Sequence, residues 1–243
     1  MTKLSLIIPV KNDLDNFKKT ITNLNFYEDI ETIVVDGNSN DGLKEYIFSS
    51  DLKKKITFIN QKSQGLYQGF NEGLDSANSD YVAFLCCGDI YRTSVALKII
   101  EKYDADIIAA SCTFLEDNKK VTYLRSKRKS IGNRNMSILH GSLIVKKKAY
   151  EAINGFDENF KVSADVQAIY EIKKFGKIKY SDEIVVDQIP YGVSNDLYFR
   201  KIFEHSRILI RANYFFYGLM YIPMRIIKDY IILTIWKLIK NKR

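Results

Sequence analysis

Short apolar runs alternate with helix-like periodicity through the first half of the chain. Two of the runs, Glu31–Asp36 and Tyr81–Asp89, end in an acidic residue. Strands as apolar as these are typical of the centre of a parallel sheet, where both faces are buried. We expect strands at Leu4–Val10, Glu31–Asp36, Ile56–Ile59 and Tyr81–Cys86, with helices at Asp13–Leu24, after a cap at Asn40 or Asp41, and at Tyr67–Ala77.

The second half continues this pattern less regularly. We expect helices at Ser94–Tyr103 and Ala164–Phe175, and strands at Ile107–Cys112, Val121–Leu124, Ile138–Val145 and Ile184–Val186. Alternating strands and helices predict an α/β fold with right-handed crossovers. The expected architecture is a doubly wound, Rossmann-like, mostly parallel sheet flanked by helices.

The acidic strand ends, Asp36 and Asp89, give the first indication of function. A carboxylate at the end of a central strand lies at the carboxyl edge of the sheet, where open α/β folds bind their ligands. Two carboxylates at that edge can bind a metal–diphosphate, the polar face of a nucleotide, or both. The pair indicates a nucleotide-dependent enzyme.

The net charge of +8 is concentrated at the carboxyl end of the chain. Ten Lys and Arg residues and two acidic residues follow from Leu197 onward, so residues 1–196 carry 27 basic and 27 acidic groups. A neutral domain has no excess positive charge for a phosphate-backbone groove, so we expect no nucleic-acid partner. We therefore divide the chain into a catalytic domain, 1–196, and a basic aromatic helical tail, 197–243.

The tail has the composition of a helix that lies in a membrane interface. It mixes basic residues with aromatic ones, including Trp236. Its longest uncharged run, Ala212–Met224, is shorter than the roughly twenty residues that a spanning helix needs. The alternative is that the tail packs on the domain or on a second subunit. We favour an anionic membrane surface, because nothing in the neutral domain needs ten cations beside it.

Several other classes are disfavoured because their motifs are missing. A dinucleotide fingerprint requires a glycine-rich turn directly after the first strand, and Lys11–Leu14 contains no glycine. No Gly-x-Gly loop of a methyltransferase follows any early strand. The three cysteines form neither a disulfide framework nor a zinc-ligand pattern, which suits a reducing cytosol. We interpret Cys86 and Cys87 as small buried residues at a strand end.

An ordered series of motifs runs through the larger domain. It comprises Leu4–Asn12, Ile33–Gly42, Gly65–Tyr67 with Asn71–Gly73, Asp80–Asp89, His140–Gly141, Gly155–Asp157, Asp165 and Gly192–Ser194. This series resembles glycosyltransferase family 2, in the branch that builds bacterial surface polysaccharides. The resemblance covers roughly residues 4–195. It implies a GT-A type fold and inverting transfer from a nucleoside-diphosphate sugar, usually with Mg²⁺ or Mn²⁺.

The resemblance also implies roles for individual residues. Asp165 would be the catalytic base, and Asp89 the surviving carboxylate of an Asp-x-Asp metal motif. His140 would lie near the diphosphate or the acceptor. The nucleotide-binding residues would be Pro9, Asp36, Gly37, Ser39, Gly65 and Asn71. This division of roles fits the chemistry, since inverting transfer needs a base for the acceptor hydroxyl and a cation for the departing diphosphate.

The implied partners are a UDP- or GDP-sugar and a lipid-linked or oligosaccharide acceptor, as in O-antigen or capsule synthesis. The implied location is cytoplasmic and peripheral, on the inner face of the bacterial cell membrane, with a homodimer as one option. The chain departs from the family pattern at Cys86 and Gly88, within the metal motif, and at Gln68, where this branch commonly has Asp.

Two alternatives stay open. One is a non-catalytic sugar-nucleotide-binding subunit of a polysaccharide assembly complex, which the degraded metal motif would suit. The other is a sugar nucleotidyltransferase, which would need a Gly/Arg/Lys-rich loop after the first strand that this chain lacks.

Overall fold

The computed structural model describes residues 2–116, 119–123, 139–189 and 197–240. Contacts between residues divide the chain into two compact units, Met1–Tyr191 and Gly192–Arg243. The motif Gly192–Ser194, the residue Leu124 and the predicted domain boundary at residue 196 lie outside the described residues.

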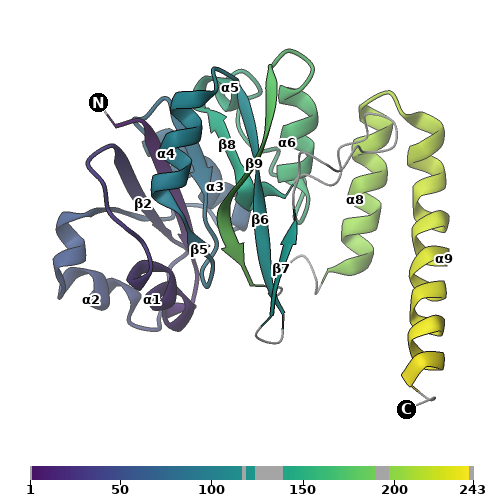
Figure 1. The fold of residues 1–243 in the computed structure, drawn as a ribbon, viewed down its shortest axis with the longest axis horizontal. Coiled ribbons are helices and arrows are strands. Elements are labelled where there is room, and N and C mark those ends of the chain that lie inside the picture. Colours follow the sequence, from purple (N-terminus) through teal and green to yellow (C-terminus); the bar gives the residue numbers. More distant parts are fainter. Residues whose placement is uncertain (1, 117–118, 124–138, 190–196, 241–243) are drawn as a thin grey trace. The chain divides into compact units, whose positions relative to one another are not determined.

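The first unit is a mixed α/β structure (Figure 1). Its elements are β1 (Leu4–Val10), α1 (Leu14–Thr22), β2 (Ile30–Asp36), α2 (Leu43–Phe48), η1 (Asp51–Lys54), β3 (Ile56–Asn60), α3 (Leu66–Ser76), β4 (Tyr81–Phe84), β5 (Ile90–Tyr91), α4 (Thr93–Lys102), β6 (Ile107–Glu116), β7 (Lys119–Tyr123), η3 (His140–Ser142), β8 (Leu143–Lys146), α5 (Lys147–Glu151), α6 (Ala164–Ile172) and β9 (Ile178–Gln188). Within the described residues, the strands form one nine-stranded sheet in the order β3-β2-β1-β4-β8-β6-β9-β5, with β7 paired to β6.

The first four strands pair in parallel, as the alternating pattern predicts. The register pairs Val10 with Asp36 and Asp36 with Asn60, so β1, β2 and β3 end at the same level. Strand β4 lies on the other side of β1, where Ile7 is paired with Phe84. The segments that follow these strands therefore meet at one edge of the sheet.

Beyond β4 the sheet becomes mixed. Strand β8 is antiparallel to β4 and β6, β9 is parallel to β6, and β5 is antiparallel to β9. The predicted strand Ile138–Val145 is wrong over His140–Ser142, which forms a 3₁₀ turn before β8 begins. The predicted short strand Ile184–Val186 is part of β9, an eleven-residue strand. Its first half is largely exposed, with only Ser181 buried, so its apolar end alone gave the strand signal in the sequence.

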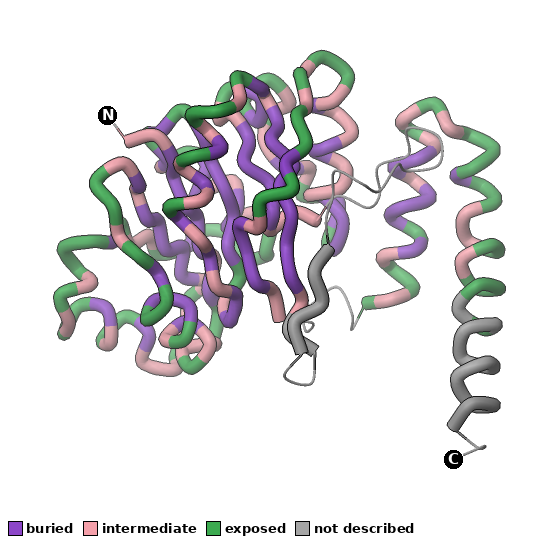
Figure 2. Tube along the Cα trace, in the orientation of Figure 1, coloured by how far each residue is buried: buried purple, intermediate pink, exposed green. Residues whose placement is uncertain are grey.

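Helices cover both faces of the parallel strands. Leu4, Leu6, Ile8 and Val10 share a core cluster with residues of α1, α2 and α4. On the opposite face α3 comes very close to the sheet, since a Cβ at Gly73 would lie 2.5 Å from Cγ2 of Ile7. Buried residues accordingly follow one another along the central strands (Figure 2).

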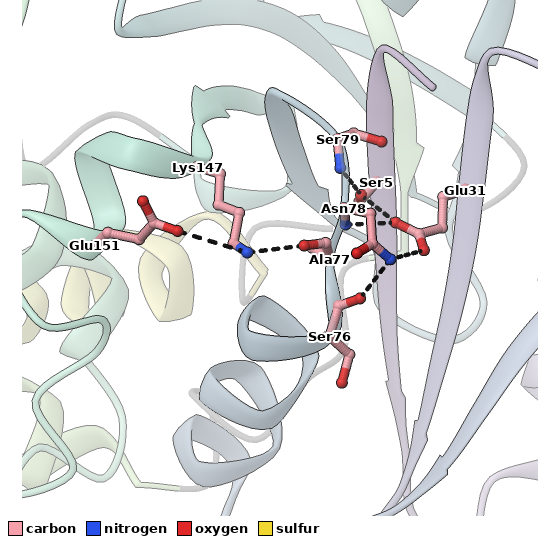
Figure 3. Close-up of polar contacts among 8 residues, drawn as sticks. All are labelled: Ser5, Glu31, Ser76, Ala77, Asn78, Ser79, Lys147 and Glu151. Carbon is pink, nitrogen blue, oxygen red and sulfur yellow. Dashed lines mark hydrogen bonds and ion pairs between the residues drawn. The ribbon is translucent and has the colours of Figure 1, made fainter. Parts of the chain in front are cut away.

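A polar network fixes the amino edge of the parallel strands (Figure 3). The Glu31 carboxylate accepts hydrogen bonds from the Ser5 hydroxyl at 2.6 Å and from the backbone and side-chain amides of Asn78 at 2.9 and 2.8 Å. Nearby, Lys147 donates to the carbonyl oxygen of Ala77 at 2.8 Å. Because Asn78 and Ala77 form the connection from α3 to β4, these contacts set where β4 enters the sheet.

The described part of the second unit, residues 197–240, is a pair of helices, α8 (Tyr198–Arg211) and α9 (Phe215–Lys240). The turn between them contains Asn213 at φ 64°. The two helices touch closely, because the Ser206 hydroxyl donates to the carbonyl oxygen of Gly218 at 2.6 Å and a Cβ at Gly218 would lie 2.9 Å from the Ser206 carbonyl oxygen. Among the described residues, no helix combines the length and the apolar character required to cross a bilayer.

The Glu31 network yields a stability prediction. We expect Glu31→Ala to lower the free energy of unfolding by about 1–3 kcal/mol, because the mutation removes the acceptor of three hydrogen bonds around the buried Ser5. Urea denaturation measures the change, with the exposed Glu28→Ala as the matched control. Equal stability of the two variants would show that the network does not hold the α3–β4 connection.

Candidate active site

Asp36 lies at the carboxyl edge of the sheet, as its position at a strand end predicts. It is the last residue of β2, and 3% of its surface is exposed. Its Oδ1 accepts a hydrogen bond from the backbone N–H of Ser39 at 2.9 Å. This bond uses one carboxylate oxygen and fixes the side chain at the start of the loop.

The loop after β2 is tied to the loop after β1. The Ser39 hydroxyl accepts from the backbone N–H of Asn12 at 2.9 Å, and the Asn12 side chain accepts from the N–H of Asn40 at 2.9 Å. Asp41 accepts from the N–H of Leu14 at 2.7 Å, so it fixes the start of α1. Asn12 adopts φ 51°, in the left-handed region that asparagine tolerates better than most residues. The two loops thus form one braced rim.

Gly37 and Pro9 lie on this rim. The Gly37 N–H donates to the carbonyl oxygen of Val10 at 2.7 Å, and a Cβ at Gly37 would lie 3.1 Å from Cβ of Lys11. Glycine therefore permits a close approach of the two loops. Pro9 is half-buried in β1, and its carbonyl oxygen accepts a weak contact from the Cys87 thiol at 3.8 Å.

Asp89 is a buried carboxylate that lies between the end of β4 and β5. Its residue surface is 3% exposed, and Gly88 before it turns the chain at φ 91°. Its Oδ1 accepts from the N–H of Ile189 at 2.9 Å, and its Oδ2 accepts from Nε2 of Gln188 at 3.4 Å. Burial raises the pKa of Asp89 from 3.8 to about 6, although both hydrogen bonds oppose the shift. The protein around Asp89 therefore does not fully replace the hydration that the ionised carboxylate loses on burial.

Gln188 was not among the residues expected from the sequence. Its Nε2 contacts Asp89, while its Oε1 is buried and has no hydrogen-bond partner among the described residues. It also fits against the His140–Gly141 turn, since a Cβ at Gly141 would lie 2.6 Å from Nε2 of Gln188. The sequence pattern that could have predicted Gln188 is an apolar run that ends in polar residues at the end of a strand, as β2 ends at Asp36.

An ion pair beside Asp89 holds β5 against β9. Arg92 donates through one nitrogen to both carboxylate oxygens of Asp187, at 2.9 and 3.1 Å, and the Thr113 hydroxyl also donates to Asp187. Asp187 is 3% exposed, and it is paired with Ile90 across the two strands. Because Ile90 follows Asp89 and Gln188 follows Asp187, this pair fixes the strands that place Asp89 and its partners.

Asp165 lies in the first turn of α6, where it is half-buried. Its Oδ1 accepts a hydrogen bond from the Tyr67 hydroxyl at 3.0 Å. The negative charge of Asp165 also acts on the His140 imidazole. It raises the pKa of His140, but burial lowers that pKa by more. Asp165 and His140 are thus brought together, although they are far apart in the sequence.

His140 is held in an aromatic cluster. Its ring stacks on Phe84 at 4.9 Å and on Phe70 at 5.4 Å between ring centroids, and its Nε2 lies 3.4 Å from the Tyr150 hydroxyl. Burial lowers the pKa of His140, so the ring is neutral at pH 7. It is suited to accept or donate a single hydrogen bond there, but not to act as a cation.

Cys86 lies within electrostatic reach of both Asp89 and Asp165. Desolvation raises the pKa of its thiol to about 12, and the negative charges of the two carboxylates add to the effect. The residue nevertheless keeps exposed surface, and Cys87 is half-buried, so the prediction that both are buried is wrong. Because both carboxylates act on the same thiol, Asp89 and Asp165 lie in one neighbourhood.

Gly65 precedes the first turn of α3, and Asn71 lies in its second turn. Gly65 adopts φ 129° as the residue before the helix, a conformation open to glycine. Both ends of the Asn71 amide are bound to the backbone of Phe156, at 2.8 Å to its N–H and 3.0 Å to its carbonyl oxygen. The nucleotide-binding role of these two residues stays a prediction.

The fit of this site to a divalent cation rests on Asp89. Among the described residues, no group of three or more His, Cys, Asp or Glu side chains gathers as a cation site. Mg²⁺ is commonly held by one or two carboxylates and the phosphates of a substrate. A buried carboxylate with a raised pKa and an orphaned amide oxygen beside it fits a cation that is shared with a diphosphate.

Comparison with known proteins identifies a family. The model of the family Glycosyl transferase family 2 matches residues 5–163. The glycosyltransferase GlyA of Streptococcus pneumoniae is 25% identical over 194 residues, which are 75% of this chain and 28% of that protein. The GalNAc(5)-diNAcBac-PP-undecaprenol beta-1,3-glucosyltransferase of Campylobacter jejuni is 34% identical over 108 residues, 42% of this chain and 35% of that protein. The chain thus spans about a third of each of these relatives.

Solved structures share the fold. TarS of S. aureus in complex with UDP superposes with a TM-score of 0.68 at 16% identity, over 87% of this chain and 65% of that one. The mannosyltransferase of Pyrobaculum calidifontis, in complex with GDP-Man and Mn²⁺, gives 0.64 at 15% identity, over 86% and 64%. These similarities confirm the predicted GT-A type α/β fold.

The raised pKa of Asp89 has a consequence for stability. A carboxyl group whose folded-state pKa is raised binds its proton more tightly in the folded protein, so stability falls as the pH rises from about 4 to about 6. We expect Asp89→Asn to increase the free energy of unfolding at pH 7.5 by at most about 3 kcal/mol, because the amide carries no charge to desolvate. Gln188 can then turn its amide and accept from the new Asn.

Urea denaturation of the metal-free protein at pH 7.5 and at pH 4 tests this expectation. The stabilisation should shrink toward the acidic end, and Asp36→Asn serves as a matched strand-end control. A loss of stability in Asp89→Asn at pH 7.5 would mean that the ionised carboxylate supports the fold.

Proposed function

The chain belongs to glycosyl transferase family 2, and we propose that it moves a sugar from a nucleoside-diphosphate sugar to a glycan acceptor, with inversion at the anomeric carbon. The observation that carries the proposal is the placement of three carboxylates: Asp36 ends β2 at the carboxyl edge of the sheet, while Asp89, after β4, and Asp165, at the start of α6, both lie within electrostatic reach of Cys86. They divide into a nucleoside side, a diphosphate side and an acceptor side.

On the donor side, Asp36 would bind the nucleoside together with Pro9, Gly37 and Ser39. Asp36 uses one oxygen for Ser39 and keeps the other for a base N–H or a ribose hydroxyl. Asp89 would hold Mg²⁺ or Mn²⁺, which supplies positive charge to the departing diphosphate. Support comes from structural neighbours solved in complex with UDP, with UDP-GlcNAc, and with GDP-Man and Mn²⁺.

On the acceptor side, Asp165 would take the proton of the attacking hydroxyl as the new bond to the anomeric carbon forms and the bond to the diphosphate oxygen breaks. Neutral His140, stacked on Phe70 and Phe84, would orient the diphosphate or the acceptor by one hydrogen bond. We infer that the acceptor is a glycan in bacterial surface polysaccharide synthesis, of O-antigen or capsule type. A relative whose name specifies an undecaprenol-linked glycan supports a lipid-linked one.

A screen of nucleotide sugars tests this function. We expect one UDP- or GDP-sugar to release its nucleoside diphosphate in the presence of Mn²⁺, and Asp165→Asn to lower the turnover number by about 10²–10⁴ while donor affinity stays unchanged. Calorimetry measures affinity, and release of UDP or GDP measures turnover. Donor binding without any turnover by the wild type would favour the non-catalytic subunit instead. Transfer of a nucleotidyl group to a sugar phosphate would favour the nucleotidyltransferase.

We also propose that the second unit attaches the enzyme to the cytoplasmic face of the membrane. Helix α9 carries large apolar side chains on several sides, with Phe216 79%, Tyr230 71% and Met224 65% exposed. Its exposed start is visible in Figure 2. Arg200 and Lys228 are exposed as well. Apolar and basic residues in one helix pair fit an anionic bilayer better than a second copy of the same basic surface.

Flotation with vesicles tests the membrane proposal. We expect the full chain to float with vesicles that contain anionic lipid, and Arg200→Glu with Lys228→Glu to weaken this strongly, since each cation near an anionic leaflet contributes about 1 kcal/mol. Lys53→Glu with Lys54→Glu, in the first unit, makes the same change in net charge and should float as the wild type does. If both double variants float equally, the charges of the second unit do not bind lipid. Size-exclusion chromatography at several protein concentrations would then show whether the chain forms a dimer, which would assign this surface to a second copy.

A further inference from the structure

The hydroxyl of Tyr67 is the hydrogen-bond donor to Asp165. It lies 3.0 Å from Oδ1 and comes from α3, 98 residues away along the chain. Among the described residues, Asp165 has no ion-pair partner. We propose that Tyr67 is a positioning residue that holds Asp165 ready to take the acceptor proton. This inference rests on the proposed function, because it assumes that Asp165 is the base.

Tyr67 is itself held rigidly. The residue is 4% exposed, its ring lies against Phe156 with centroids 5.8 Å apart at an interplanar angle of 24°, and it meets Phe70 edge-on at 5.5 Å. A ring packed on two aromatic neighbours has little freedom to swing. The packing of the ring therefore helps to fix the position of its hydroxyl.

Helix α3 grips the segment before Asp165 at two further points. The Asn71 amide pairs with the backbone N–H and carbonyl of Phe156, and Gln68 donates to Glu158 at 3.2 Å. Gly155 makes this approach possible, since it adopts φ 74° and a Cβ there would lie 2.5 Å from Oδ1 of Asn71. Tyr67, Gln68 and Asn71 thus bind, from neighbouring turns of α3, the loop and first turn that carry the base.

The hydrogen bond affects both the geometry and the charge of Asp165. It occupies Oδ1 and restricts rotation of the carboxylate, so Oδ2 keeps one direction in which to accept a proton. Loss of a hydroxyl donor to a carboxylate disfavours the ionised form that a base needs, so substitution of Tyr67 gives an effect that a pH–rate profile can detect. The other ionisable groups that sense this carboxylate, His140, Tyr150 and Cys86, are held neutral by burial and cannot replace the donor as cations.

The substitution Tyr67→Phe tests the proposal, because it removes the hydroxyl and keeps the ring. With the nucleotide sugar that the wild type turns over, we expect the turnover number to fall about ten- to a hundredfold, the range for a hydrogen bond to a charged group. The KM for the donor should stay the same, and the acidic limb of the pH–rate profile should move to higher pH. Tyr81→Phe is the matched control, since it removes a buried hydroxyl that donates to the carbonyl oxygen of Ala105 at 3.2 Å, at the other end of the sheet.

The outcomes separate a positioning role from a structural one. If Tyr67→Phe and Tyr81→Phe lose similar stability and both keep full turnover, or if Tyr67→Phe loses turnover with no shift of the pH–rate profile, the proposal is overturned. If the wild type turns over no nucleotide sugar, the proposed function fails, and crystal structures still decide the inference. The Asp165 side chain should then be ordered in the wild type and adopt several rotamers in Tyr67→Phe, and an unchanged single rotamer would contradict it.

Discussion

The parallel pairing of β2, β1 and β4 is the constraint on which the rest of the structure depends. Three strands that run in the same direction in one register deliver their following loops to one edge, so Asp36 and the segment leading to Asp89 have to meet there. The amino edge of the same strands carries the Glu31 network, which is saturated with internal hydrogen bonds. The two edges therefore have different tasks: one fixes the register, and the other presents groups that the protein leaves partly unsatisfied.

Asp89 is the clearest case of such a group. Its burial would favour the neutral acid, and the hydrogen bonds from Ile189 and Gln188 do not overcome this. A fold optimised for stability alone would replace it by an amide. Asp89 is nevertheless a carboxylate, and the amide oxygen of Gln188 beside it has no hydrogen-bond partner among the described residues. We expect this arrangement where a cation and a diphosphate complete the site.

Local pattern predicts the parallel half of this fold well. Apolar runs and their acidic ends locate β2 and β4, and the direction of parallel strands then places Asp36 at the functional edge. The pattern fails where the partner is remote. Arg92, directly after β5, binds Asp187 in β9, although residues 92–177 separate the two strands, and nothing near either residue in the sequence indicates the other. Gln188, next to Asp187, reaches Asp89 from the same remote strand. The same holds for Tyr67 and Asp165, whose contact follows from the packing of α3 against the loop at Gly155 and Phe156. His140 was predicted within a strand because apolar residues surround it, and those residues pack around a turn instead.

The central claim is that the carboxyl edge binds a nucleoside diphosphate through Asp36 and a divalent cation through Asp89. A crystal structure of the full chain with UDP or GDP and Mn²⁺, with data collected for anomalous scattering, tests it most directly. We expect an anomalous peak between a diphosphate oxygen and a carboxylate oxygen of Asp89, with the nucleoside beside Asp36. A manganese peak remote from Asp89, or a nucleotide bound away from the ends of β1 and β2, would contradict it.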